Sequence, residues 1–125
     1  MTKQNAFLVK LNLKSLNINN KFEQIIKSTN GFEVLKHNGY RTPDLLIFEL
    51  GDDAENEMEL IQTLLDNGDA GEIFLTSTSS ESTILMRAMR IGVKEFISQP
   101  ISENGVRQAL EGFRKRQSES VKCFP

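Results

Sequence analysis

The sequence predicts a doubly wound α/β domain, in which helices cover both faces of a five-stranded parallel sheet. Strand-like and helix-like segments alternate along the chain, as they do in proteins built from βαβ units. The segment 45–50 (LLIFEL) is almost continuously apolar, which is typical of a strand buried on both faces. Gly31, Gly68 and Gly92 each follow a helix-like segment, at a position where helices commonly end.

The size and composition fit a single globular domain. The chain has 125 residues, 38% of them apolar and 26% charged, with a net charge of −2. This charge gives no general attraction to nucleic acid or to anionic membranes, so neither is an expected partner. The only cysteine, Cys123, excludes a disulfide framework, and we expect a cytoplasmic location. No apolar run approaches the ~18 residues of a membrane span, so we expect no direct insertion into a membrane.

Five strands and four helices are expected. The strands are 6–13, 32–36, 45–50, 72–77 and 95–98. The helices are 20–30 with Asn20 as its cap, 54–66, a segment capped by Ser80 or Ser82 that ends at Ile91, and a final helix capped by Ser102. Residues 117–125 are polar and without periodicity, so we expect a domain at 1–116 followed by a linker or tail.

The second and third strands are joined by an unusually short segment. Only residues 38–42 lie between the two strand-like segments. A parallel crossover usually needs about ten residues or more and commonly contains a helix. We therefore expect the helix between these two strands to be missing or reduced to a loop.

Three segments coincide with the third, fourth and fifth strands: PDLLIFEL, FLTS and RIGVKEFISQPI. In this order and spacing they resemble the response-regulator receiver family, whose CheY-like domains have a flavodoxin-like fold. The resemblance covers about residues 6–116 and implies the sheet order 2-1-3-4-5. It also implies particular roles at the carboxyl ends of the strands, where doubly wound sheets bind their ligands. These positions are the phosphoacceptor (Glu49), the switch hydroxyl (Thr76 or Ser77), the aromatic switch (Phe96), the lysine (Gln99) and the cis-proline (Pro100).

The sequence departs from the family at the positions that carry its chemistry. The first strand ends in residues 11–15 (LNLKS), without the carboxylates that would hold Mg²⁺, and Lys14 would repel a cation. Glu49 replaces the acceptor aspartate, and Gln99 replaces the lysine. Phosphoryl transfer relies on cations that neutralise developing charge. We therefore expect no metal, no cofactor and no enzymatic activity, and we interpret the domain as a degenerate receiver.

The pattern is similar to the N-terminal domain of the CpaE/TadZ pilus-assembly localisation proteins. Those proteins carry a degenerate receiver followed by an ATPase domain of the ParA/MinD type. The basic segment 114–116, followed by polar residues, resembles the junction ahead of that ATPase. The P-loop pattern G-x-x-x-x-G-K-[ST] does not occur in the sequence itself. The resemblance thus implies a module that localises or dimerises a larger protein.

Several interpretations stay open from the sequence. Glu49 either mimics a phosphorylated state or is a solvated carboxylate, and Thr76 and Ser77 are either switch hydroxyls or caps of the next helix. The main alternative function is a working phosphoacceptor receiver of a two-component system. A flavin-binding flavodoxin-like domain is a weaker one, because the loop at 12–20 lacks glycine.

The expected partners are proteins, first of all a second copy of the chain. Receivers commonly pair through the region that corresponds here to residues 84–116. Its fourth helix in family order carries more apolar residues than one buried stripe requires, so we expect an exposed apolar surface. We assign to this surface Ile84, Met89, Arg90, Lys94 and Arg107.

Overall fold

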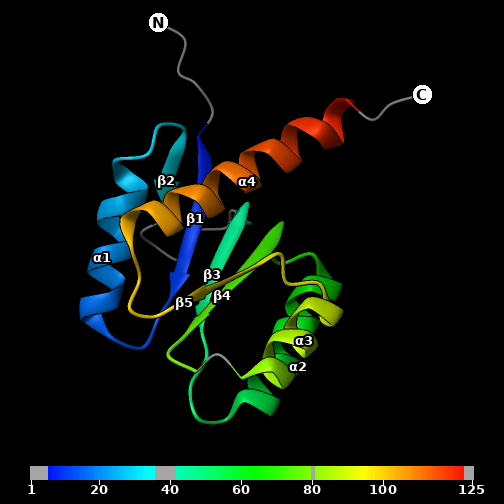
Figure 1. Cartoon of the computed structure of the whole chain (residues 1–125). Helices are drawn as coiled ribbons and strands as arrows, with labels where there is room; N and C mark the ends of the chain where they lie inside the picture. Colours follow the sequence, from blue (N-terminus) through cyan, green and yellow to red (C-terminus); the bar gives the residue numbers. More distant parts are fainter. Residues whose placement is uncertain (1–5, 36–41, 80, 123–125) are drawn as a thin grey trace, which may run out of the picture.

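A computed structural model describes residues 6–35, 42–79 and 81–122, with side chains to residue 118 (Figure 1). Its centre is a five-stranded parallel sheet in the order β2-β1-β3-β4-β5. The strands are β1 (Phe7–Asn12), β2 (Phe32–Val34), β3 (Leu45–Glu49), β4 (Glu72–Ser77) and β5 (Glu95–Ser98). Both the predicted fold class and the predicted strand order are confirmed.

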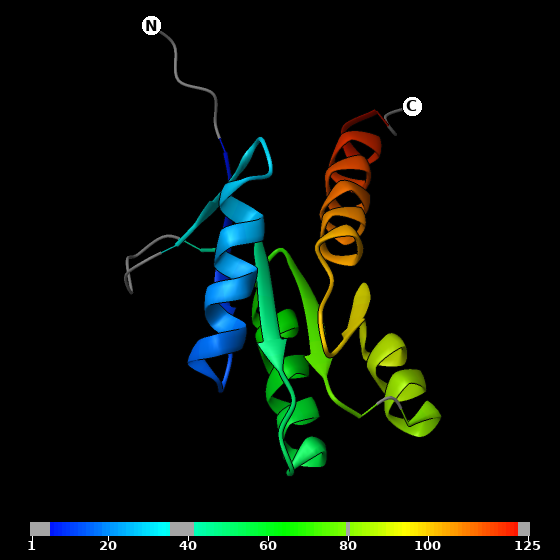
Figure 2. The same cartoon turned by 60° about the vertical axis from the view of Figure 1, so that its left-hand side comes forward.

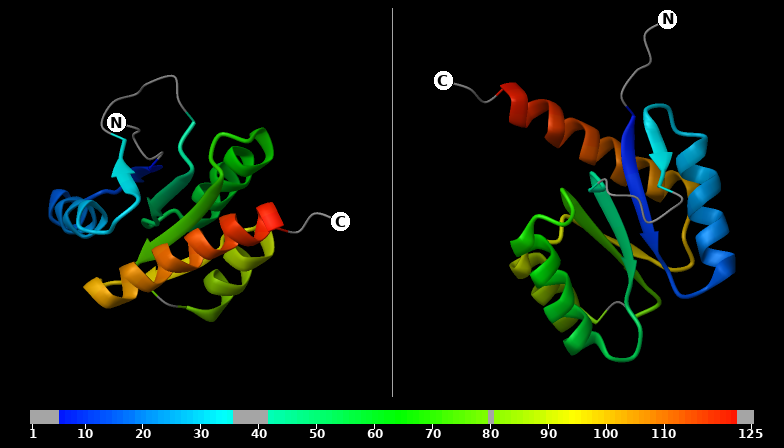
Figure 3. Two further views of the ribbon diagram at one scale, coloured as in Figure 1. Left: turned by 90° about the horizontal axis from the view of Figure 1, so that it is seen from above. Right: turned by 180° about the vertical axis from the view of Figure 1, so that it is seen from behind.

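Four helices cover the sheet in two layers. They are α1 (Leu16–Lys27), α2 (Ala54–Asn67), α3 (Ser82–Ile91) and α4 (Glu103–Lys122). α1 and α4 lie on one face, and α2 and α3 lie on the other (Figures 1 and 3). No helix among the described residues combines the length and the apolar character that crossing a membrane requires.

The alternation of side chains along β3 divides the core in two. Leu45 and Ile47 belong to the cluster under α1 and α4, whereas Leu46 and Phe48 belong to the cluster under α2 and α3. All four side chains are buried, as the apolar run in the sequence predicts. Burial on both faces fixes the position of β3 along the strand direction within the sheet. It thereby fixes the position of Glu49 at the end of β3.

Two predicted helix starts are wrong. α1 begins at Leu16 with Ser15 as its N-terminal cap, one turn before Asn20. The added turn brings Ile18 onto the same core as Phe22, four residues later. α3 has Glu81 as its N-terminal cap with no side-chain capping bond, whereas Ser80 lies outside the described residues.

The predicted cap of the last helix is confirmed, but the helix is longer than expected. Ser102 Oγ accepts a hydrogen bond from the Gly105 amide at 3.0 Å. α4 then continues through residue 122, and its last turns project beyond the sheet (Figures 1 and 2). The segment expected as a linker is therefore helical up to residue 122. The division into a domain at 1–116 and a tail stays a prediction.

The connection from β2 to β3 passes across β1, which lies between them. Its described residues, 35 and 42–44, contain no helix, and residues 36–41 lie outside the described part of the chain. Lys10 of β1 and Glu33 of β2 are exposed on the face opposite α1. Polar residues at these two positions fit a sheet face that none of the described helices covers there.

Candidate functional site

The candidate site lies where the strands end, at the lower edge of the sheet in Figure 1. Parallel strands bring their carboxyl ends to the same edge, so residues far apart in the sequence meet there. Glu49 ends β3, Thr76 and Ser77 end β4, and Gln99 follows β5. The structure brings Glu49, Thr76 and Gln99 into one hydrogen-bonded network.

Glu49 uses both oxygens of its carboxylate inside the protein. Oε1 accepts from the backbone amide of Lys14 at 2.8 Å, and Oε2 accepts from Gln99 Nε2 at 3.1 Å. Both donors are neutral groups, an amide N–H and a carboxamide. Glu49 therefore links the loop after β1 to the segment after β5. It is neither free nor simply solvated.

The hydroxyl of Thr76 is part of the same network. It is fully buried, donates to the Ile97 carbonyl at 2.7 Å, and lies 3.3 Å from Gln99 Nε2. The Oγ of Ser77 instead accepts from the amide of Ser79 at 3.0 Å, which closes a local turn. Neither residue caps α3, whose cap is Glu81.

A second group of contacts closes the site on the side of β1. Lys14 Nζ lies 3.0 Å from Glu57 Oε2, and Glu57 Oε1 accepts from the Gly51 amide at 2.7 Å. The predicted site included neither Glu57 nor Gly51. The sequence signal that could have found this pair is Glu57 itself, an acidic residue in the first turn of α2, the helix that begins just after β3.

The resemblance to receivers implies a Mg²⁺ ion at this end of the sheet, but the residues present do not fit one. β1 ends in Asn12, and Glu49 already accepts one hydrogen bond on each oxygen. No cluster of three or more His, Cys, Asp or Glu suited to a metal occurs among the described residues. Mg²⁺ requires several oxygen ligands in near-octahedral geometry, and this donor set does not supply them.

The segment after β5 has the geometry that the sequence predicts. The peptide bond between Gln99 and Pro100 is cis, as expected. Phe96, at the aromatic switch position, is half-buried against the core under α2 and α3. Its side chain thus lies on the opposite face of the sheet from Ile97.

The predicted interaction residues do not all gather on one surface. Ile84 packs against the core under α2 and α3. Arg107 lies on the α1 side of α4, where it bonds Ser28 Oγ at 2.8 Å and pairs with Glu103. Met89, Arg90 and Lys94 are exposed.

Two exposed methionines, Met86 and Met89, and the partly buried Leu85 define an apolar surface on α3. Met86 is 60% exposed and Met89 is 50% exposed. Together with Leu85 and Arg90 they line one shallow, largely apolar depression. Met86 and Leu85 are part of it although the predicted site residues did not include them. We call this set the α3 surface.

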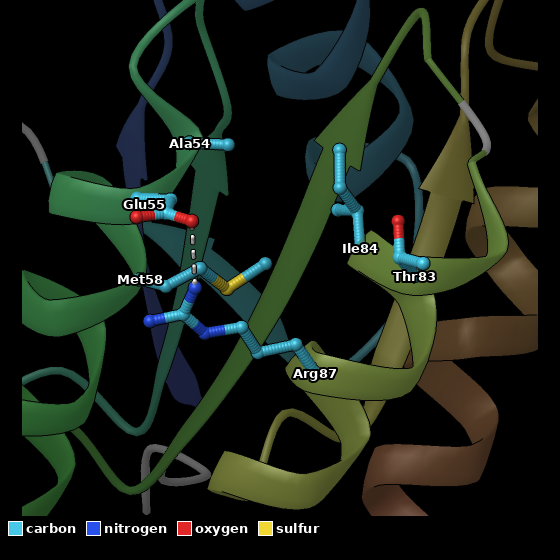
Figure 4. Close-up of a pocket in the computed structure, with 6 residues that line it drawn as sticks. All are labelled: Ala54, Glu55, Met58, Thr83, Ile84 and Arg87. Atoms are coloured by element: carbon cyan, nitrogen blue, oxygen red, sulfur yellow. Dashed lines mark ion pairs between the residues drawn. The ribbon is translucent and has the colours of Figure 1, made fainter.

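A small pocket lies between the N-terminal parts of α2 and α3 (Figure 4). Its volume is about 140 Å³, and Ala54, Met58 and Ile84 supply its apolar lining. Arg87 reaches across it to Glu55, at 3.7 Å between Nη1 and Oε2. Both of these side chains are largely exposed, so the pair contributes little to stability.

Comparison with known proteins places the fold among receivers, although no family model matches the chain. The chain is 21% identical over 106 residues to the chemotaxis protein CheY of Listeria monocytogenes, covering 85% of this chain and 89% of that protein. A response regulator from Thermotoga maritima superposes with a TM-score of 0.76 at 13% identity, covering 86% of this chain and 97% of the other. The CpaE pilus assembly protein of Burkholderia thailandensis superposes with a TM-score of 0.70 at 16% identity, again with 86% and 97% coverage. The chain has the CheY-like response-regulator receiver fold.

Proposed function

We propose that this receiver-fold domain is a non-catalytic pseudo-receiver, a signalling module that acts by binding other proteins. The observation that carries the proposal is the bonding of Glu49. Each oxygen of its carboxylate accepts from a neutral donor of the protein itself, Lys14 N–H on one side and Gln99 Nε2 on the other. The site is thus closed by its own hydrogen bonds.

The residues at the site also lack the groups that phosphoryl transfer requires. Such a reaction depends on cations that neutralise the charge developing on the transferred group. A neutral carboxamide, Gln99, contacts the acceptor position, and the ammonium of Lys14 is paired with Glu57. We infer that the domain is not an enzyme and that its state does not depend on phosphorylation.

The proposal includes a setting in a larger protein. Fold neighbours include a CpaE pilus assembly protein. We propose that the domain is cytoplasmic and that it mediates the dimerisation or localisation of a larger protein of that kind, in which an ATPase domain of the ParA/MinD type follows it. A working phosphoacceptor receiver is the alternative, and phosphorylation of Glu49 would favour it.

The partner that we propose for the α3 surface is a second copy of the chain. Exposed apolar patches of this kind commonly mark protein contacts, and methionine adapts its shape easily to a partner. In an antiparallel pair of α3 helices related by a two-fold axis, Met86 of one copy meets Met89 of the other. The same register brings Glu81, before α3, close to Lys94 of the other copy, after α3. Both residues are exposed and they carry opposite charges.

Sedimentation equilibrium tests the dimer. We expect a monomer–dimer equilibrium in the micromolar range that phosphodonors do not change. The double variant Met86→Glu, Met89→Glu should shift this equilibrium to the monomer. Leu60→Glu is the matched control, because Leu60 is 47% exposed but lies on α2. A chain that stays monomeric at high micromolar concentration, or a dimer that tolerates the two glutamates, would exclude this surface.

A further inference from the structure

The side chain of Lys14 takes an unusual path across the loop after β3. A Cβ atom placed on Gly51 would lie 2.6 Å from Lys14 Cε and 3.3 Å from its Cδ. Real Cβ atoms essentially never approach another atom this closely. The lysine stem can follow this path because position 51 has no side chain.

This path makes Lys14 part of a closed ring of contacts. Its amide bonds Glu49 at the end of β3, and its ammonium pairs with Glu57 in the first turn of α2. Glu57 returns to the loop by accepting from the Gly51 amide at 2.7 Å. One residue after β1 thus joins the acceptor strand to the helix that follows it.

We propose that Lys14 is an internal counter-ion, whose ammonium takes the place of an external cation at this end of the sheet. Two carboxylates, Glu49 and Glu57, are held beside the loop that contains Gly51. Among the described ion pairs, Lys14 supplies the cation within 4.0 Å of Glu57. The ring needs no bound metal and no modification, so the loops after β1 and β3 keep one arrangement.

The inference deepens the proposed function, because it explains how a receiver fold without phosphoryl chemistry keeps its site closed. It is distinct from a packing role of the lysine stem. If only the stem mattered, methionine at position 14 would replace lysine fully. If the charge matters, loss of the ammonium leaves carboxylate oxygens that an external cation can bind.

Thermal unfolding with and without Mn²⁺ tests this on the whole chain. Lys14→Met keeps an unbranched stem over Gly51 and removes the charge. We expect 10 mM Mn²⁺ to raise the midpoint of Lys14→Met by about 3 °C or more, because a ligand that binds the folded state stabilises it. The wild-type midpoint should not move. Lys10→Met, the same change at an exposed position of β1, should behave as the wild type.

A second variant assigns the metal response to the site. Glu57→Ala in the Lys14→Met chain should abolish the shift, because it removes the carboxylate that the Lys14 ammonium neutralises. An equal Mn²⁺ shift in the wild type and in Lys14→Met, or no shift in Lys14→Met, would overturn the proposal. Either result leaves the proposed lack of phosphorylation intact, since that is measured separately by mass.

Discussion

Gln99 Nε2 lies 3.1 Å from Glu49 Oε2, and this contact joins the ends of β3 and β5 directly. The same nitrogen lies 3.3 Å from the buried hydroxyl of Thr76, which bonds the Ile97 carbonyl. Side chains therefore add to the backbone hydrogen bonds that connect three strands at this edge. In a domain of this size such a network holds the loops at the site in one arrangement.

Replacing Glu49 by glutamine should destabilise the domain. A carboxamide has only one acceptor oxygen, so the Lys14 amide or the Gln99 side chain loses its partner unless the Gln99 carboxamide turns over, which removes its donor from Thr76 Oγ1. Leaving one such donor unsatisfied costs about 1–2 kcal/mol, which urea unfolding measures as a lower midpoint at unchanged slope. Glu59→Gln on the exposed side of α2 is the control and should change little. Equal stability of the two variants would mean that the Glu49 contacts contribute nothing.

Gly51 and Gly112 should respond in opposite ways to alanine. At Gly51 the new Cβ would collide with the stem of Lys14, so the lysine must shift and its ion pair with Glu57 is weakened. We expect a loss of up to about 1 kcal/mol, since the pair is half-exposed. At Gly112, inside α4, the nearest atoms lie 3.4 Å or more away, so alanine should stabilise the helix by about 0.5–1 kcal/mol. Chemical denaturation of both variants checks the contrast, and a stabilising Gly51→Ala would contradict it.

Arg116 should be a sensitive polar residue of the last helix. It makes bonds of 2.9 to 3.2 Å to both oxygens of Glu72, whose side chain is only 8% exposed. Arg116→Ala leaves that carboxylate buried with only Gln117 as a side-chain donor, which should cost about 3 kcal/mol. The double variant Arg116→Met, Glu72→Leu should recover much of the loss. A double variant that is less stable than Arg116→Ala would contradict this account.

The same pair sets a pH expectation. The hydrogen bond to Glu72 raises the pKa of the Arg116 guanidinium above its ordinary value, against the lowering effect of burial, and the charges of Glu72 and Glu95 add to the increase. A pKa that is raised on folding stabilises the folded state at every pH below the ordinary pKa of the group. This contribution is lost only as the pH rises through the raised pKa of the folded state. Because guanidinium groups are always protonated near neutrality, unfolding between about pH 7 and 10 should reveal no step from Arg116. A step that Arg116→Lys removes would contradict the assignment.

Local patterns in the sequence predict most of the fold, and the failures have particular causes. The strands follow from runs such as LLIFEL, because burial on both faces leaves a continuous apolar segment. The start of α1 was missed because Leu16 is 75% exposed, so the first turn has a weak apolar stripe. The helical residues after Arg116 were missed because they are polar and their anchor, Glu72, is distant in the sequence.

The site shows a similar division. The motifs predict that Glu49, Thr76 and Gln99 lie together, because each stands at or just after the end of a strand and parallel strands end at the same edge. The pairing of Lys14 with Glu57 depends on the path of one side chain over Gly51, which no periodicity encodes. Likewise the contact of Arg107 with Ser28, at the end of α1, joins residues far apart in the sequence, so no local pattern predicts it.

Intact-mass spectrometry after incubation with a small phosphodonor and Mg²⁺ shows whether Glu49 accepts a phosphoryl group. A CheY protein with an aspartate acceptor, treated in parallel, confirms that the donor is active. The account predicts that the mass of this chain stays unchanged. A gain of one phosphoryl group that disappears in Glu49→Gln would contradict it and would identify a working receiver.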